Sequence, residues 1–198
     1  SIIITTYNEK KYIKECIESC LLQRYQNFEI IVVDNYSDDG TDEILKSYKD
    51  KIIIEKINNK EIISKSRNLA LKKAKGDWVV LLDADDFFTK NKLSELVLNI
   101  EKSNFDVFCN SEIILDSTNR KRIWFNGNKS KNLYLDLIKY GNCLSTSASA
   151  VKKIFLEKNN IFFSEERKIR NIADYDFFLN IAKAGGKFYF LNTPLGFH

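Results

Sequence analysis

The sequence predicts an α/β fold built on a mainly parallel sheet with helices on both faces. Apolar, β-branched runs alternate along the first hundred residues with segments that carry one apolar face at helical spacing. The apolar runs are unbroken, as expected of strands buried on both faces. The polar clusters of this half follow the ends of such runs. Because ligands of parallel sheets gather beyond the carboxyl ends of the strands, these clusters are candidates for a binding site.

The elements of the first half are expected in the order β-α-β-α-β-α-β. Strands are expected at 1–5, 28–33, 52–54 and 78–82, and helices at 8–21, 41–48 and 62–75. Thr41 is a favoured N-cap residue for the second helix. Gly76 is expected to close the third helix.

From about residue 105 the order of the segments is less regular. Strands are expected at 105–109, 121–125, 145–151 and 187–191, and a helix at 174–184 that Gly185 and Gly186 terminate. We expect a single domain over 1–198, with a nucleotide-binding half at 1–104 and a more variable half at 105–198. Because the chain starts without methionine and stops straight after a strand, we expect it to be a fragment of a longer protein.

Composition narrows the class of protein. The 198 residues are 44% hydrophobic and 29% charged, which is the balance of one soluble globular domain. The net charge of +4 is too small and too scattered to indicate nucleic-acid binding. Neither a signal peptide nor a membrane-spanning stretch is evident, so we expect a cytoplasmic protein. Basic pairs such as Lys72-Lys73 are expected on solvated helix faces, and they leave peripheral contact with anionic membrane lipid open.

The four cysteines are expected to be reduced thiols. Cys16 and Cys20 lie one helical turn apart within an apolar helix stripe. A zinc site is not expected, because no Cys-x-x-Cys spacing occurs and the single histidine is His198.

Three carboxylates follow the last apolar run of the first half, in the sequence Asp83-Ala84-Asp85-Asp86. On an extended strand Asp83 and Asp85 point to the same side, so they can address one ligand together. A divalent cation such as Mg²⁺ or Mn²⁺, or a sugar hydroxyl beside it, would relieve their repulsion. The alternative is an acidic turn that caps a helix starting near Lys90.

Four blocks of this chain resemble the family 2 glycosyltransferases in order and spacing. They are Ser-Ile-Ile-Ile-Thr-Thr-Tyr-Asn-Glu at 1–9, Ile-Val-Val-Asp-Asn-Tyr-Ser-Asp-Asp-Gly-Thr at 31–41, Ser-Arg-Asn-Leu-Ala at 66–70 and Leu-Asp-Ala-Asp-Asp at 82–86. The second half is similar more loosely, through 174–179. The resemblance implies a GT-A fold with a Rossmann-like donor half and an acceptor-binding second half. It also implies a nucleotide-sugar donor, a divalent metal, and inversion at the anomeric carbon.

The resemblance also implies roles for individual residues. The donor-binding residues would be Thr6, Tyr7, Asn8, Glu9, Asp34, Arg67, Asp83 and Ala84. In similar enzymes Asp34 accepts a hydrogen bond from the uracil ring and Asp83 holds the ribose hydroxyls. By the same resemblance, Asp85 would bind the Mn²⁺ or Mg²⁺ that bridges the phosphates, and Asp174 takes the position of the family's catalytic base. Simpler accounts are a strand-end turn for Asp34, an exposed helix cation for Arg67, and a favourable helix N-terminal charge for Asp174.

The chain departs from the family pattern at three positions. Ala173 stands where glutamate usually precedes the base, Thr5 where proline is common, and Tyr36 where glycine is common. Tyr36 implies an altered base pocket, although a UDP-sugar is still the expected donor. His198 is either an extra metal ligand or a solvated terminal residue.

We therefore expect a metal-dependent inverting hexosyl- or N-acetylhexosaminyltransferase. It would move a sugar from a UDP-sugar to a hydroxyl of a glycan or lipid-linked acceptor in surface polysaccharide synthesis. The metal would neutralise the departing diphosphate, and a carboxylate would take the proton of the acceptor hydroxyl. Two alternatives stay open. One is a non-catalytic relative that binds a nucleotide sugar, which Ala173 favours. The other is a nucleotidylyltransferase, which would carry a glycine-rich phosphate loop where this chain has 5–10.

Overall fold

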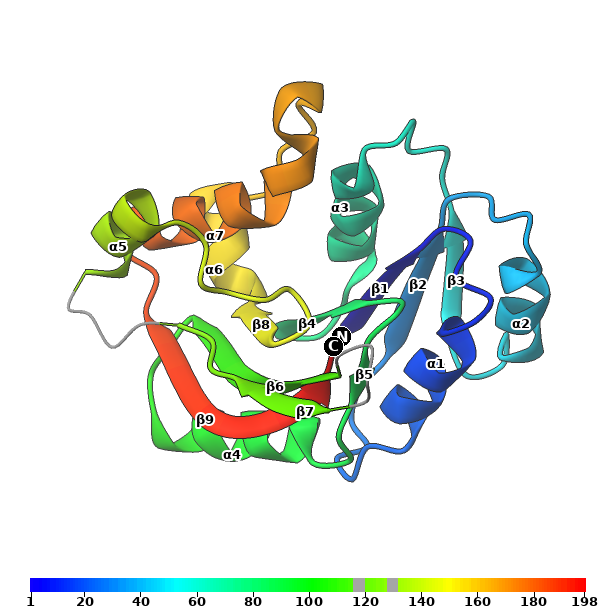
Figure 1. Cartoon of the computed structure of the whole chain (residues 1–198), viewed down its shortest axis with the longest axis horizontal. Helices are drawn as coiled ribbons and strands as arrows, with labels where there is room; N and C mark the ends of the chain where they lie inside the picture. The colour runs from blue at the N-terminus through cyan, green and yellow to red at the C-terminus, as the bar shows by residue number, and fades with distance from the viewer. Residues whose placement is uncertain (116–119, 128–131) are drawn as a thin grey trace.

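A nine-stranded sheet runs through the computed structural model, which describes residues 1–115, 120–127 and 132–198 (Figure 1). The strand order is β3-β2-β1-β4-β8-β6-β9-β5, and β7 pairs with β6 beside this path. The strands are β1 Ile2–Thr6, β2 Ile30–Asp34, β3 Ile53–Lys56, β4 Trp78–Asp83, β5 Phe87–Phe88, β6 Val107–Leu115, β7 Lys121–Trp124, β8 Ser149–Lys152 and β9 Phe188–Phe197. The helices are α1 Ile13–Leu21, α2 Thr41–Ser47, α3 Ile63–Lys73, α4 Lys92–Lys102, α5 Leu133–Tyr140, α6 Lys153–Asn159 and α7 Ala173–Lys183, with a 3-10 helix η1 at Arg167–Ile172.

The first four strands form the predicted parallel sheet. Ile4 of β1 pairs with Val32 of β2 on one side and with Leu82 of β4 on the other. Both β1 and β2 are buried along their whole length, which explains their unbroken apolar sequences. The carboxyl ends of β1, β2 and β4 therefore meet at one edge, where Thr6 lies beside Asp34 and Thr5 beside Asp83.

Several boundaries in this half differ from the prediction. The second strand starts at Ile30 rather than at residue 28, and the first helix starts at Ile13, after a turn in which the amides of Tyr12 and Ile13 bond to the carbonyl of Glu9. Thr41 is not the N-cap of α2. Gly40 takes that place with a φ of 104°, a left-handed conformation that costs glycine little.

The second half of the sheet is mixed, so the prediction of mainly parallel strands holds only for the first half. β8 runs antiparallel to both β4 and β6, whereas β6 and β9 are parallel. β9 extends well past the predicted 187–191, because register shifts around Ser111 let the ladder continue beyond Pro194. The strand predicted at 145–151 is reduced to β8, since the amide of Ser149 bonds back to the carbonyl of Thr146 in a turn.

Helices cover both faces of the sheet and enclose one apolar layer on each side (Figure 1). Side chains from α1, α2 and α4 pack in one layer, for example Ile17, Leu45 and Leu96. Side chains from α3, α5, α6 and α7 pack in the other, as Leu71 and Phe177 do. Within the described residues, the helices are too short or too polar to cross a bilayer.

The four cysteines are free thiols with different surroundings. Cys16, Cys20 and Cys109 are buried, whereas Cys143 is half-buried. Burial raises the pKa of Cys20 and of Cys109 to about 12, so their reactive thiolate forms are scarce at neutral pH.

We expect a single cysteine, Cys143, to react readily in the folded protein. A maleimide followed by mass spectrometry should label it at least about tenfold faster than the buried thiols, because the thiolate must be both formed and reached. Cys143→Ser should remove the fast phase and leave the slow one. Fast labelling of two or more cysteines would contradict the packing of the core.

Candidate functional site

A cavity of about 740 Å³ opens at the carboxyl ends of β1, β2 and β4. Its wall consists of Thr5, Thr6, Tyr7, Glu9, Asn35, Tyr36, Asn58, Asn59, Lys60, Glu61, Ile63, Ser66, Arg67, Asp83, Ala84, Asp85 and His198. The cavity thus brings together the predicted residues Thr6, Tyr7, Glu9, Arg67, Asp83, Ala84, Asp85 and His198. Three predicted residues, Asn8, Asp34 and Asp174, do not line it.

An ion pair joins α3 to the end of β4 across this cavity. Nη2 of Arg67 lies 2.8 Å from Oδ1 of Asp83, and the side chains are 9% and 31% exposed. The guanidinium of Arg67 also lies over the ring of Phe163, 5.2 Å from its centre. Arg67 is therefore a buried site residue and not an exposed helix cation.

The remaining carboxylates of the β4 turn have separate environments. Asp86 is buried, and its carboxylate accepts hydrogen bonds from the Ser147 hydroxyl and from Nδ1 of His198, the latter over 3.0 Å. The bond to Asp86 is the main reason why the pKa of His198 is raised to about 9. Asp85 faces the cavity. Partial burial, followed by the negative charges of Asp86 and Asp83, raises the pKa of its carboxyl group.

A divalent cation matches the hard carboxylate oxygens of this turn, but the turn alone supplies few ligands. Within residues 1–115, 120–127 and 132–198, no three side chains of His, Cys, Asp or Glu converge as a metal site would require. His198 contacts Asp86 and not Asp85. Asp85 therefore fits a cation that takes most of its oxygen ligands from a bound molecule or from water.

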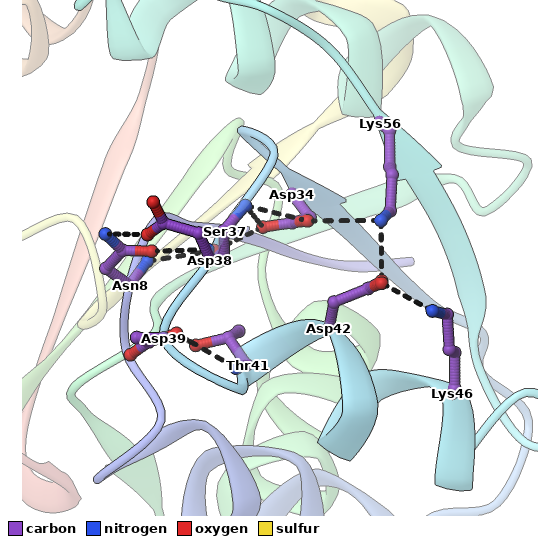
Figure 2. Close-up of polar contacts among 9 residues, drawn as sticks. All are labelled: Asn8, Asp34, Ser37, Asp38, Asp39, Thr41, Asp42, Lys46 and Lys56. Carbon is purple, nitrogen blue, oxygen red and sulfur yellow. Dashed lines mark hydrogen bonds and ion pairs between the residues drawn. The ribbon is translucent and has the colours of Figure 1, made fainter.

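Asp34 is fully buried below the cavity and is held by its own loop (Figure 2). The Ser37 hydroxyl donates to Oδ1 of Asp34 over 2.5 Å, and the Ser37 amide lies 3.2 Å and 3.3 Å from the two carboxylate oxygens. Nζ of Lys56 lies 3.8 Å from Oδ2 of Asp34 and 2.6 Å from Oδ1 of Asp42. Asp34 therefore organises the loop after β2, and its carboxylate is enclosed by that loop and not on the cavity wall.

Asn8 clamps the loop after β1 to the loop after β2 (Figure 2). Its side-chain amide donates to Oδ1 of Asp38 over 3.0 Å and accepts from the Asp38 amide over 3.0 Å, while its own backbone amide bonds to Oγ of Ser37 over 2.9 Å. Asn8 has a φ of 55°, a left-handed conformation that asparagine tolerates better than most residues. Its position is therefore structural, beside the cavity rather than on its wall.

Tyr36 also has a positive φ, at 56°, and its side chain is 60% exposed. Glycine adopts such a conformation at little cost, which gives a physical reason for glycine being common at this place in the family that the chain resembles. At this position Tyr36 has a strained backbone conformation, and its side chain adds an aromatic ring to the cavity wall.

The loop between β3 and α3 forms part of the cavity wall, and none of its residues was predicted as a site residue. Asn58, Asn59, Lys60 and Glu61 line the cavity, and both Lys60 and Glu61 have positive φ values. Their signal was available, because this polar run also follows the end of a predicted strand. Glu61 pairs in addition with Arg170 of η1 over 2.8 Å, which ties the two halves of the chain together above the sheet.

Asp174 lies in the first turn of α7, as predicted, and its Oδ2 accepts a hydrogen bond from the Asn142 side chain over 3.2 Å. This contact is exposed, and it belongs to the second half of the chain. The predicted base is therefore separate from the residues that enclose the cavity.

Comparison with known proteins gives family and fold. A model of the family described as Glycosyl transferase family 2 matches residues 1–157. The poly(ribitol-phosphate) beta-N-acetylglucosaminyltransferase TarS of Staphylococcus aureus is 31% identical over 175 residues, which cover 85% of this chain and 30% of TarS. An uncharacterized glycosyltransferase of Haemophilus influenzae is 32% identical over 186 residues, which cover 92% of this chain and 71% of that protein.

Solved structures of other glycosyltransferases resemble this fold over nearly the whole chain. The crystal structure of TarS 1–349 in complex with UDP has a TM-score of 0.80 at 25% identity, covering 100% of this chain and 59% of that one. The mannosyltransferase PcManGT from Pyrobaculum calidifontis, in complex with GDP-Man and Mn²⁺, has a TM-score of 0.69 at 20% identity and covers 98% and 54%. These matches confirm the predicted fold. The chain spans less than a third of the length of TarS.

The ion pair between Arg67 and Asp83 should contribute to stability because both groups are largely withdrawn from water. Arg67→Met should lower the free energy of unfolding in urea by about 1–2 kcal/mol, since it leaves the Asp83 carboxylate without its cation. Adding Asp83→Asn should recover part of that loss.

Lys73→Met is the matched control on the same helix. It breaks the more exposed pair between Lys73 and Glu55, and it should cost at most about 0.5 kcal/mol. If Arg67→Met and Lys73→Met lowered the free energy of unfolding equally, the pair at the cavity would stabilise the protein no more than an exposed pair does.

Proposed function

Because the chain belongs to glycosyl transferase family 2, we propose that it binds a nucleotide-sugar donor and transfers the sugar to an acceptor hydroxyl. The observation that carries the proposal is the cavity at the carboxyl ends of β1, β2 and β4. It combines a buried cation, Arg67, a carboxylate, Asp85, and two aromatic rings at one edge of the sheet. A nucleoside diphosphate sugar needs all three, since it carries a flat base, hydroxyl groups and a doubly charged leaving group.

The proposed donor is a UDP-sugar. TarS has been crystallised with UDP and with UDP-GlcNAc, which supports this choice. Tyr7 and Tyr36, which are 55% and 60% exposed on the cavity wall, would flank the base. Asp34 would accept the ring N–H, which requires the loop after β2 to uncover its buried carboxylate. Thr6, Glu9 and Ala84 would complete the donor pocket, while Asn8 holds its loops.

Asp85 is the proposed protein ligand of a divalent cation, Mn²⁺ or Mg²⁺. Partial burial, and after it the charges of Asp86 and Asp83, raise the pKa of Asp85, and a bound cation would offset both effects. PcManGT, a structural neighbour, was crystallised with Mn²⁺. When bound, such an ion would neutralise charge on the departing diphosphate. His198 is the second candidate ligand, and binding would require it to leave Asp86.

Asp174 is the proposed base for the acceptor hydroxyl. Its carboxyl group lies in the first turn of α7, where the helix dipole favours negative charge, and Asn142 donates a hydrogen bond to one of its oxygens. In that position it would take the proton of the attacking hydroxyl and leave the donor cavity to the sugar nucleotide. Direct displacement of the diphosphate by the acceptor hydroxyl would invert the anomeric centre.

The acceptor is proposed to be a glycan or a lipid-linked saccharide of surface polysaccharide synthesis. TarS is named for transfer to poly(ribitol-phosphate), which supports an acceptor of this kind. Residues 105–198 would form the acceptor half and 1–104 the donor half, within a longer protein. The four free cysteines support a reducing, cytoplasmic location. Peripheral contact with the membrane would bring the site to a lipid-linked acceptor.

Isothermal titration calorimetry with UDP, GDP and CDP, with and without Mn²⁺, tests the donor site. We expect UDP to bind most tightly and only with Mn²⁺, and Asp85→Ala to weaken binding at least about tenfold because it removes the carboxylate ligand. Asp50→Ala, an exposed carboxylate outside the cavity wall, is the control and should bind UDP as the parent does. A UDP affinity that changes neither with Mn²⁺ nor with Asp85→Ala would overturn the metal assignment. Failure of all three nucleotides to bind would overturn the donor site.

Asp174→Asn tests the base, with Asp176→Asn on the same helix as its matched control. We expect Asp174→Asn to lower kcat about 10²–10⁴-fold with little change in UDP affinity, since the base acts on the acceptor and not on the nucleotide. Asp176 bonds to Asn180 within the helix, so Asp176→Asn should keep most of the activity. Release of UDP from UDP-GlcNAc and UDP-Glc with a glycan acceptor is the measurement. A parent chain that binds the donors tightly without turning over any would instead support a non-catalytic relative.

A further inference from the structure

A fully buried lysine lies behind the carboxylate turn and takes no part in the proposed chemistry. Lys92 starts α4 and is 0% exposed. Its ammonium lies 5.1 Å from the ring centre of Phe88 and 5.8 Å from that of Phe108. Burial lowers the pKa of Lys92 to about 8. Burying an ammonium group costs free energy, and the groups that it binds must offset that cost.

The hydrogen bonds of this ammonium all go to neutral oxygens on two segments of the second half. Nζ of Lys92 bonds to Oδ1 of Asn110 in β6, and to the carbonyls of Ala148 over 2.9 Å and Ser147 over 3.4 Å. The carbonyls belong to the turn before β8. An apolar side chain in place of Lys92 would take one donor from each of these buried oxygens, although the Ala148 carbonyl would keep its bond from the Asn110 amide. Lys92 therefore fixes the backbone at Ser147 and Ala148.

The turn that Lys92 holds is in direct contact with the carboxylates. The Ser147 hydroxyl accepts a hydrogen bond from the Asp83 amide over 3.0 Å and donates one to Oδ2 of Asp86. One hydroxyl thus touches the residues on both sides of Ala84 and Asp85. Its own position is set by the backbone whose carbonyls Lys92 binds.

We propose that Lys92 is a positioning residue for the donor site, acting through Ser147 to fix the backbone of the turn that presents Asp83 and Asp85. This inference rests on the proposed function for its consequence, since the turn is where donor and metal would bind. Without the ammonium, the Ser147 carbonyl loses a donor and the hydroxyl no longer has a fixed place. Asp83 and Asp86 then lose a shared partner, and Asp85 between them loses its orientation toward the cavity.

The first test needs no ligand, so it stands even if the proposed function fails. Native-state hydrogen exchange is measured for the amides of Asp83 and Leu82 in the parent, Lys92→Met and Leu96→Ala. Leu96 is a buried core residue on the same helix, and Leu96→Ala is the control for a loss of packing alone. We expect Lys92→Met to speed exchange at Asp83 about tenfold relative to Leu82, which lies one residue earlier inside the β1–β4 pairing. Leu96→Ala should change the two amides together.

The second test asks whether the effect passes through Ser147. The Kd for UDP with Mn²⁺ is measured by calorimetry for Lys92→Met, Ser147→Ala, the double variant and Leu96→Ala. If Lys92 acts through the Ser147 hydroxyl, both single variants weaken binding about tenfold and the double variant binds no more weakly than the weaker single one. Leu96→Ala should stay within about twofold of the parent. Lys92→Gln keeps a neutral N–H donor and should restore part of the Asp83 protection, and it replaces Lys92→Met if that variant does not fold.

The outcomes separate the two proposals. Equal behaviour of Lys92→Met and Leu96→Ala, or losses that add in the double variant, would reduce Lys92 to a packing residue and overturn the inference. A parent chain that binds no nucleotide would overturn the proposed function. In that case faster exchange at Asp83 in Lys92→Met would still establish the positioning role.

Discussion

The site depends on the electrostatic repulsion among three carboxylates placed at the end of one buried strand. The three carboxylates of the β4 turn differ in the contacts that offset this repulsion. Asp83 is paired with Arg67, and Asp86 is buried against Ser147 and His198. Asp85 is left at the cavity wall with a raised pKa. Asp83 and Asp86 each have a partner inside the protein, whereas Asp85 faces the cavity, where its carboxylate is open to a ligand.

A second set of contacts gives the cavity its shape without entering it. The loops after β1 and β2 are joined by Asn8 and Asp38, and the Ser37 hydroxyl is bonded to Asp34 below them (Figure 2). These contacts hold Asn8 and Tyr36 in left-handed conformations, so backbone strain there is balanced by hydrogen bonds in the same loops. The backbone that carries Tyr7 and Tyr36 is therefore already in place, which would lower the entropy cost of ordering these loops around a ligand.

How much the sequence could reveal differs between the two halves. The strands of the first half were predictable because β1 and β2 are buried on both faces and carry no polar interruption. The extent of β9 could not be predicted, because Asn192, Thr193 and Pro194 interrupt its apolar pattern. The pairing with β6 continues beyond them through a register shift, for which the sequence contains no signal. About half of the cavity wall was predicted, through motifs that resemble a known family, while the contribution of Lys60 and Glu61 depends on backbone conformations that their types do not favour. The burial of Lys92 is beyond pattern reading, since lysine is almost always at the surface.

The single sheet has a consequence for how the protein acquires its structure. The two halves of the chain, 1–104 and 105–198, are continuous in hydrogen bonding, because β4 is paired with β8 and β8 with β6. β6 is in turn completed by β9, with Val107 beside Phe188 and Ile113 beside Phe197. Such pairings between distant parts of the chain form slowly, and during synthesis the unpaired edge of β4 stays open until β8 has emerged. The halves differ in sequence character, yet their strands belong to one sheet, and an edge of β4 left unpaired during synthesis would be a template for association between chains.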